Sequence, residues 1–373
     1  MKIIISILLV FGFAKISCSQ DSISPKELQK KFFNNGKLKA NSTSEIAEYV
    51  KSNFDKEEDK VRAAYSWVIT NISYDTDSAR IINAGIDPDA KITVAFKRRK
   101  GVCENFAAIF NDICVRSGIT SFVIDGYTKQ GGRVDKIAHS WCAASIDNKW
   151  YLFDPTWDAG SRENFKFFMV PPEEFIESHM PFDPLWQLLN HPISHEQFYT
   201  GNYFANNKIS SLNFSDSVAA YIQMDSLQRL QSTEYRIQKF GLYNSRINEN
   251  YAVVKMNIEI ANQDKELESY NSAIESLNDA TTILNNFIEY RNNKFIPEKP
   301  DGQMAIMLDN IDNKIIVALK KLNEVDQSQA RLVLGTQPAR EKLDILSKKI
   351  EDQKRFLKLF LTTAKNERNS VFY

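Results

Sequence analysis

The clearest helical pattern in the chain lies between residues 103 and 117. Its apolar positions recur at the three- and four-residue spacing of an amphipathic helix, at Phe106, Ile109, Phe110, Ile113 and Cys114. Gly118 follows at the position where a helix commonly ends. The pattern therefore predicts a helix that begins at Cys103 and buries one face.

The segment before this helix also shows helical periodicity. Ile46, Tyr49 and Val50 share one face, and the next segment repeats the pattern from Val61 to Ile69 before ending near Asn71–Asp75. We therefore expect residues 21 to 100 to be helices and loops.

Strand patterns follow the predicted helix. Residues 121–127, 137–146 and 150–153 are rich in β-branched and aromatic side chains, and a glycine-containing turn at 129–132 separates the first two. Asp147 and Asn148 tolerate the left-handed backbone of a two-residue hairpin. With that turn, Ile146 pairs with Lys149. A helix followed by antiparallel strands predicts an α+β fold.

The chain changes character near residue 205, where long heptad patterns begin. Three segments alternate apolar steps of three and four, broken at Pro297–Gly302 and Gly335–Pro338. The positions of this repeat, which are apolar except for two glutamines and one threonine, are Val253, Met256, Ile260, Gln263, Leu267, Tyr270, Ile274, Leu277, Thr281, Leu284 and Ile288; Met304, Leu308, Ile311, Ile315, Ala318, Leu322 and Val325; and Leu343, Leu346, Ile350, Gln353, Leu357, Phe360 and Ala364.

These heptads predict an all-α antiparallel bundle over residues 206–373, with Val218–Phe240 as a candidate fourth helix. We interpret the heptads as a packing seam within the chain, and an oligomerising coiled coil is the alternative. The preceding domain is expected to cover residues 20–205.

The first 19 residues have the composition of a secretory signal. Lys2 precedes the apolar run Ile3–Ala14, and small residues at Ser17 and Ser19 fit cleavage before Gln20. We therefore expect export to the periplasm or out of the cell, with no integral membrane span after cleavage. An N-terminal anchor, or a lipoprotein acylated at Cys18, is the alternative.

Composition excludes few functions. The chain has 373 residues, enough for two domains, and a formal net charge of zero, which does not point to nucleic acid as a partner. Cys103, Cys114 and Cys142 remain after cleavage, and three cysteines are not a disulfide framework. An unpaired thiol in an exported protein is either a reactive nucleophile or an inert core residue.

Cys103, His139 and Asp154 are the candidate catalytic residues. A thiol attacks an acyl carbon as thiolate, which the N–H groups and partial positive charge of a helix start stabilise. The backbone N–H of Cys103 is also available to a developing oxyanion. In the two-residue hairpin Asp154 lies opposite Trp141, on the same face as His139 and diagonally across from it. A three-residue turn would place the two side chains on opposite faces.

The remaining candidate residues have simpler interpretations. Cys114 and Cys142 are expected in the core, with a disulfide between them as a minor alternative. Zinc bound by Cys103, Cys142 and His139 is disfavoured because the ligands would come from opposite strand faces. The basic run Lys97–Lys100 is expected to be a solvated loop, or alternatively a positive rim that favours acidic substrates. His179, His191 and His195 are interpreted as structural.

Several of these segments resemble the transglutaminase-like superfamily. Ala64–Val68 with Asn71–Asp75 resembles its entry helix, and the block from Gly101 through Gly126-Tyr127 resembles its nucleophile helix and following strand. His139–Trp141 and Trp150–Trp157 resemble its histidine and aspartate motifs. Further segments, Pro172–Ile176, Ser178–Pro181 and Trp186–Leu189, are similar to the kyphoscoliosis peptidase and cytokinesis branch.

The resemblance covers roughly residues 45 to 200 and implies a papain-like core with Cys103, His139 and Asp154 as triad. Trp67 and Tyr74 are candidates for the second oxyanion donor. The implied activity is acyl transfer on protein or peptide amides, by hydrolysis (a peptidase or amidase) or by transglutaminase crosslinking, without a metal or organic cofactor. A non-catalytic peptide-binding module is the alternative, in which the helical bundle docks a partner protein or a cell-surface component.

Overall fold

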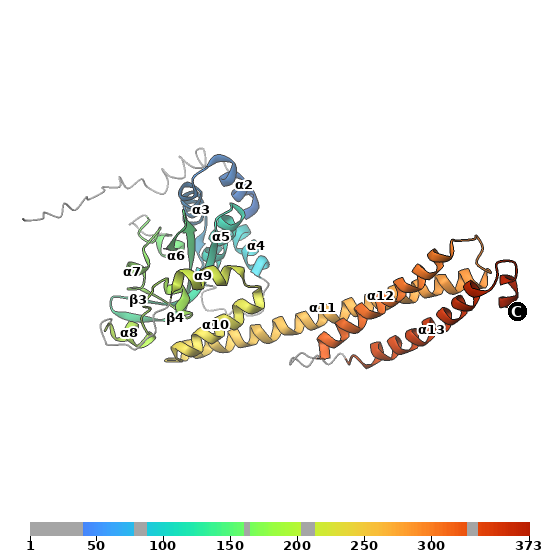
Figure 1. Ribbon diagram of the computed structural model, residues 1–373. Coiled ribbons are helices and arrows are strands. Elements are labelled where there is room, and N and C mark those ends of the chain that lie inside the picture. The colour runs from blue at the N-terminus through green and yellow to red at the C-terminus, as the bar shows by residue number, and fades with distance from the viewer. Residues whose placement is uncertain (1–39, 78–87, 160–164, 203–212, 327–334) are drawn as a thin grey trace, which may run out of the picture. The chain divides into compact units, whose positions relative to one another are not determined.

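The computed structural model describes residues 40–77, 88–159, 165–202, 213–326 and 335–373 (Figure 1). The predicted signal segment 1–19, with Cys18, lies outside these ranges. The chain divides into two compact units, Met1–Val218 and Ala219–Tyr373. In the described part of the chain, no helix combines the length and the apolar character needed to cross a membrane.

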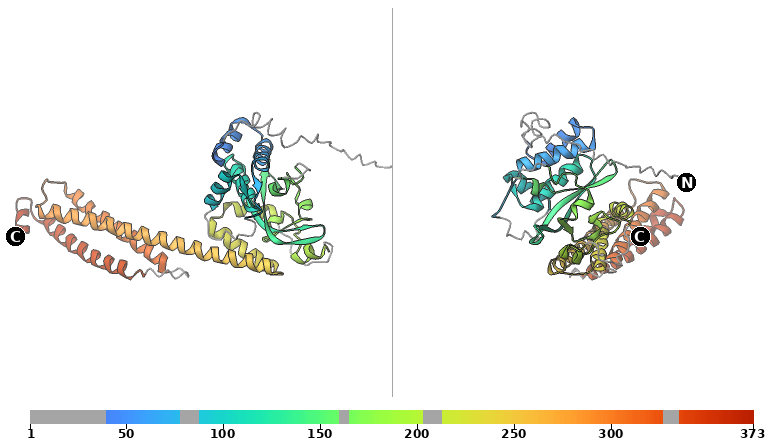
Figure 2. Two further views of the ribbon diagram at one scale, coloured as in Figure 1. Left: turned by 180° about the vertical axis from the view of Figure 1, so that it is seen from behind. Right: turned by 90° about the vertical axis from the view of Figure 1, so that its left-hand side faces the viewer.

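Three helices build the core of the first unit. They are α2 (Thr43–Asn53), α3 (Glu57–Asn71) and α5 (Cys103–Arg116), which pack against one another and against the strands (Figure 2). The five apolar residues predicted on one face of α5 are all buried, and Gly118 follows the helix with a φ of +88°. The predicted helix and its buried face are therefore confirmed.

Four antiparallel strands form the main sheet, in the order β5–β4–β3–β6. They are β3 (Ser121–Gln130), β4 (Arg133–Ile146), β5 (Lys149–Phe153) and β6 (His179–Pro181). Strands β3 and β4 continue past the predicted ends because Gly131 and Gly132 alone make the turn, with φ of 55° and 77°. Ile146 pairs with Lys149 and Cys142 with Phe153, so the predicted α+β fold and hairpin register are confirmed.

A second, two-stranded parallel sheet was not anticipated by the periodicity. Strand β1 (Ser73–Tyr74) pairs with β2 (Lys100–Gly101), and Asp75 donates its N–H to the Gly101 carbonyl at 2.9 Å. Between them lies α4 (Pro88–Arg98). This ladder joins the end of α3 to the start of α5, which brings Tyr74 beside α5.

Short elements complete the unit: α6 (Pro155–Asp158), α7 (Pro172–Phe175), the 3₁₀ turn η2 (Pro184–Gln187) and α8 (His195–Thr200). Strand β6 approaches β3 closely at Gly126, where a Cβ would lie 2.2 Å from the Met180 carbonyl oxygen and 2.4 Å from the Trp141 ring. Only glycine allows this approach. The glycine at position 126 therefore allows β6, the strand that contains His179, to pair with β3.

The second unit is helical, as predicted. Its elements are α10 (Ser226–Phe240), α11 (Ser245–Asn292), α12 (Asp301–Asp326), α13 (Gln337–Thr362) and η3 (Arg368–Phe372), while α9 (Phe214–Gln223) spans the division between the units. The buried positions of α12 and α13 follow the predicted heptads, except that Ala364 lies beyond α13 and is exposed.

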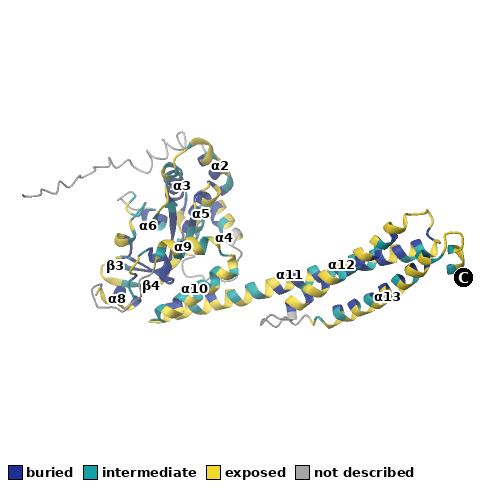
Figure 3. Ribbon diagram, in the orientation of Figure 1, coloured by how far each residue is buried: buried dark blue, intermediate teal, exposed yellow. Residues whose placement is uncertain are grey.

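The predicted seam of α11 is wrong in the first half of the helix and confirmed in the second. Val253, Met256, Ile260 and Leu267 are exposed, whereas Leu277 and Leu284 are buried. Tyr270, Ile274 and Ile288 are partly buried and pack on the same apolar cluster, which also contains Ala273, Ala280 and Phe287 (Figure 3 colours the helix by burial). With 48 residues against 26 in each of α12 and α13, α11 is too long to be covered by them along its whole length. Packing against two helices also requires a wider apolar face than a two-stranded seam.

Candidate active site

Cys103 is the first residue of α5 and is partly exposed. The Asn105 side chain accepts a hydrogen bond from the Val102 N–H at 3.0 Å, which fixes the loop that enters the helix. A Cβ on Gly101 would lie 2.6 Å from the Asn105 Cβ, so glycine is required at this approach. The N–H groups of Cys103 and Glu104 precede the first backbone hydrogen bonds of the helix, which Asn105 and Phe106 donate to the Val102 carbonyl at 2.9 and 3.2 Å.

His139 and Asp154 meet across the β4–β5 hairpin. His139 Nε2 lies 2.7 Å from Asp154 Oδ2, with the histidine 8% exposed and the aspartate fully buried. Asp154 also caps α6: its Oδ1 accepts hydrogen bonds from the N–H groups of Thr156 at 2.8 Å and Trp157 at 3.1 Å. The diagonal contact predicted from the two-residue turn is therefore confirmed.

The two side chains hold opposite charges. Burial alone would lower the pKa of His139, but the charge and hydrogen bond of Asp154, together with Cys103, raise it to about 10. Burial alone would raise the pKa of Asp154, but His139 and then His179 hold it well below its usual range. An imidazolium beside a carboxylate is therefore the favoured state at neutral pH.

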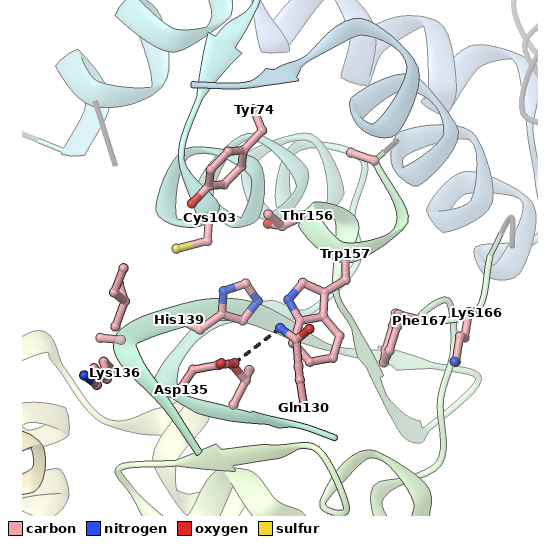
Figure 4. Close-up of a pocket in the computed structure, with 14 residues that line it drawn as sticks. Tyr74, Cys103, Gln130, Asp135, Lys136, His139, Thr156, Trp157, Lys166 and Phe167 are labelled. Atoms are coloured by element: carbon pink, nitrogen blue, oxygen red, sulfur yellow. Dashed lines mark hydrogen bonds between the residues drawn. The ribbon is translucent and has the colours of Figure 1, made fainter. Parts of the chain in front are cut away.

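Cys103, His139 and Tyr74 line one pocket of about 660 Å³ (Figure 4). The Cys103 side chain lies close enough to the His139 ring to contribute to its raised pKa, and since Nε2 is committed to Asp154, Nδ1 is the nitrogen left to face the sulfur. The rest of the lining is Thr128, Gln130, Asp135, Lys136, Ile137, Ala138, Thr156, Trp157, Ala159, Lys166 and Phe167.

Tyr74 is the oxyanion candidate that the structure brings to this pocket. Figure 4 shows its hydroxyl beside Cys103. Burial and the charge of Cys103 raise the pKa of Tyr74, so its hydroxyl keeps its proton and remains a donor at neutral pH.

Trp67, the other candidate, does not line the pocket. It is 2% exposed and stacks on Phe96 with ring centroids 5.1 Å apart, with the Arg99 guanidinium 4.7 Å from its ring. Its indole is held in the core by these contacts, and the structure therefore does not place it where an oxyanion would form.

Both predictions for the basic run Lys97–Lys100 are wrong, because this run is neither a solvated loop nor part of the pocket lining. Arg98 ends α4 and pairs with the buried carboxylate of Asp75 at 2.9 Å. Arg99 donates to the Ala40 carbonyl at 2.9 Å and stacks on Phe96. These cations hold the β1–β2 region together.

His179, which we interpreted as structural from the sequence, instead contacts Asp154. Its Nε2 is 3.1 Å from Asp154 Oδ2, the oxygen that also binds His139. Burial lowers the pKa of His179 to about 4, so its ring is neutral. His195 is elsewhere, with its Nδ1 2.9 Å from the Tyr127 hydroxyl, and His191 is exposed.

The other cysteines are core residues, as expected. Cys114 and Cys142 are buried free thiols, and the Cys142 thiol donates to the Ala107 carbonyl at 3.2 Å. Cys142 therefore points away from His139, which removes the geometry of a Cys103–Cys142–His139 zinc site. In the described residues, His139, Asp154 and His179 have ligand atoms within 4.8 Å of one another, but two imidazole hydrogen bonds already occupy Asp154 Oδ2.

Comparison with known proteins agrees with this architecture. Residues 44–155 match the family model of the transglutaminase-like superfamily. The kyphoscoliosis peptidase of Mus musculus is 30% identical over 162 residues, which are 39% of this chain and 24% of the relative. A LIM and transglutaminase domain protein of Caenorhabditis elegans is 26% identical over 167 residues, 38% of this chain and 22% of the relative.

The chain thus spans about a quarter of the length of the curated relatives it matches. A crystal structure of a TGase is 18% identical and covers 39% of this chain and 41% of its own, with a TM-score of 0.25, a likeness too weak to support a conclusion. The match to the family model, the sequence relatives and the helix-on-sheet core agree. Residues 44–155 of this chain therefore form a transglutaminase-like domain.

Proposed function

We propose that the first unit is a cysteine acyl-transfer enzyme that hydrolyses amide bonds of proteins or peptides. The observation that supports this most directly is the arrangement of three groups: Cys103 at a helix start and His139 line one pocket, and the buried Asp154 carboxylate lies 2.7 Å from His139 behind it. The peptidase among the relatives makes peptide amides the substrate class we favour.

In the proposed reaction, Cys103 and His139 are a thiolate–imidazolium pair. The sulfur attacks the amide carbonyl carbon, and the Cys103 N–H and the Tyr74 hydroxyl donate to the developing oxyanion. His139 passes its proton to the leaving nitrogen as the C–N bond breaks, which leaves a thioester. A water then gives a proton to His139 and adds to the carbonyl, which breaks the C–S bond and releases the acid.

Asp154 fixes the orientation of the His139 ring and stabilises its charge. We favour water as the acyl acceptor because the pocket is open to solvent and its volume of about 660 Å³ leaves room beside the sulfur. A primary amine in place of water would make the protein a crosslinking transglutaminase. Export of the chain remains a prediction from residues 1–19.

Alkylation of Cys103 by iodoacetamide tests the proposal. At neutral pH the wild type should react much faster than an ordinary thiol, which reacts mainly as it titrates near about pH 8.5. The variant His139→Ala should behave as an ordinary thiol, and His191→Ala, which changes an exposed histidine, should match the wild type. Wild-type labelling with the pH profile of an ordinary thiol would instead favour a non-catalytic binding module.

A labelled primary amine separates hydrolysis from crosslinking. Incubation of the enzyme with a blocked peptide amide and biotinylated cadaverine should give free acid as the product. Transfer of the acyl group to cadaverine as the main product would overturn the assignment of hydrolysis while leaving acyl transfer intact.

A further inference from the structure

Two histidines contact the Asp154 carboxylate, one that precedes it in the sequence and one that follows it. His139 comes from β4, in the middle of the sheet, and His179 from β6, at the sheet edge. Both Nε2 atoms lie within hydrogen-bonding distance of Oδ2, at 2.7 and 3.1 Å. Oδ1 accepts the two N–H groups of the α6 cap. The carboxylate therefore has four donors, two on each oxygen.

We propose that His179 is a positioning residue of the acyl-transfer site, a neutral Nε2–H donor that holds the Asp154 carboxylate in the orientation that His139 requires. This inference rests on the proposed function. It adds a fourth residue to the site, one that does not touch the substrate and acts through Asp154.

The surroundings of the two rings assign them different roles. His139 lines the pocket and faces Cys103. The His179 side chain is fully buried and stacks on Phe175, with ring centroids 4.0 Å apart. It also packs against Trp157 in a tilted arrangement, with ring centroids 4.5 Å apart. A ring enclosed by aromatic faces has no water to stabilise a positive charge, which keeps His179 neutral.

The second nitrogen of His179 fixes its tautomer. Its Nδ1 lies 2.8 Å from the Ser178 hydroxyl. A neutral imidazole has one donor and one acceptor nitrogen. Because the ionised Asp154 can only accept, Nε2 must carry the proton, and Nδ1 accepts the Ser178 hydroxyl hydrogen. The geometry thus fits one protonation state of His179.

This arrangement also explains why the two histidines do not compete. Two imidazolium ions on one buried carboxylate oxygen would repel each other, so protonation of one ring disfavours protonation of the other. Because His179 is enclosed by aromatic rings and stays neutral, the positive charge is carried by His139, the ring that faces the sulfur. Titratable groups facing His179 are Asp154 and His139, and a weaker attraction comes from the carboxylate of Asp135.

A matched pair of variants tests the inference. His179→Gln keeps an N–H donor near the Nε2 position, whereas His179→Phe keeps the ring and removes the donor. The readout is the full pH profile of Cys103 alkylation by iodoacetamide, corrected for the folded fraction measured by tryptophan fluorescence. We expect His179→Gln to stay within about threefold of the wild type.

The His179→Phe variant should lose about tenfold in rate at neutral pH, which corresponds to about 1.4 kcal/mol. Its acid limb should move to higher pH, because Asp154 gains a proton more easily without this donor. A profile of His179→Phe that superimposes on the wild type, or an equal loss in both variants, would show that His179 only packs. A wild-type thiol of ordinary reactivity would sink the proposed function itself, which is a different result.

Nitrogen-15 NMR of histidine-labelled wild-type protein gives a readout that needs no variant to fold. The His179 ring should show the neutral Nε2–H tautomer between pH 5 and 8, while His139 shows an imidazolium. A His179 ring that is protonated at pH 7, or that carries its proton on Nδ1, would overturn the inference.

Discussion

The Tyr65 hydroxyl lies 2.6 Å from the Asp158 carboxylate and 2.8 Å from the backbone carbonyl oxygen of Asp154, and all three residues are buried. This contact ties α3 to the turn that follows β5. Burial raises the pKa of Asp158 to about 6, and the Tyr65 hydroxyl partly opposes that shift. One phenol thus supports both the backbone of Asp154 and a neighbouring buried acid.

Tyr65→Phe should therefore destabilise the first unit by about 1–3 kcal/mol, because it leaves buried acceptors without their donor. All five tryptophans lie in the first unit, so urea unfolding followed by tryptophan fluorescence measures it. Tyr74→Phe, which changes a ring that is 44% exposed, is the matched control and should cost less than about 0.5 kcal/mol. Equal stability of the two variants would contradict this role of Tyr65.

His195 should make the stability of the first unit depend on pH. Burial lowers its pKa to about 4, below the value of about 6.5 in an unfolded chain. The unfolded chain then binds the proton more readily, so this stabilisation is complete above about pH 6.5 and is lost as the pH falls toward 4. The loss amounts to at most about 3 kcal/mol.

The variant His195→Asn tests the direction of this pH dependence. The Nδ1 atom of His195 lies 2.9 Å from the Tyr127 hydroxyl. Asparagine can place an acceptor near this position but does not titrate. Its free energy of unfolding should fall less between pH 6.5 and 4 than that of the wild type. His179 acts in the same direction and Asp158 in the opposite one, but both are present in the two proteins. Parallel curves would exclude His195 as a cause.

The turn at Asp147–Asn148 should tolerate glycine and reject β-branched residues. Both residues have positive φ, 49° and 62°, which is the left-handed region. Asn148→Val should cost about 1–2 kcal/mol, since a β-branched side chain is strained there. Asn148→Gly should be close to neutral, and an urea titration compares the two. Equal costs would mean that the turn does not determine the register.

Tyr74 should affect acylation and spare alkylation. An oxyanion forms when the thiol attacks an ester but not when it attacks iodoacetamide. Tyr74→Phe should therefore slow acylation of Cys103 by p-nitrophenyl acetate by about tenfold or more, with alkylation unchanged within about twofold. A parallel loss in both reactions would assign Tyr74 to the thiol rather than to the oxyanion.

The seam of α11 is testable with two leucines on the same helix. Leu284 is 1% exposed and Leu267 is 41% exposed. Leu284→Ala should destabilise the helical unit by about 2–5 kcal/mol, and Leu267→Ala by less than about 0.5 kcal/mol. Hydrogen exchange of the amides in α11 to α13 reports the difference. A large cost at Leu267 would show that this face is covered in solution.

Much of the first unit could be predicted because its signals are local. The face of α5 follows from five apolar residues, and the contact of His139 with Asp154 follows from the length of one turn. The β1–β2 ladder could not be found in this way, since two residues are too few to show alternation.

His179 was missed for a related reason. It lies in a strand of three residues, and only the close approach at Gly126 brings that strand to the sheet. In α11 the heptad spacing was regular, but the pattern does not tell how far along the helix its partners extend.

The β1–β2 ladder has a practical consequence for protein engineering. It fastens Ser73–Asp75 to Arg99–Gly101 by backbone hydrogen bonds. The helix α4, which ends just before Arg99, is also held by the domain: Phe96 is buried in its core, and Lys91 pairs with Glu104 of α5 at 2.7 Å. An affinity tag or a recognition peptide inserted within α4 would therefore disturb the start of α5, and engineered insertions should avoid this helix.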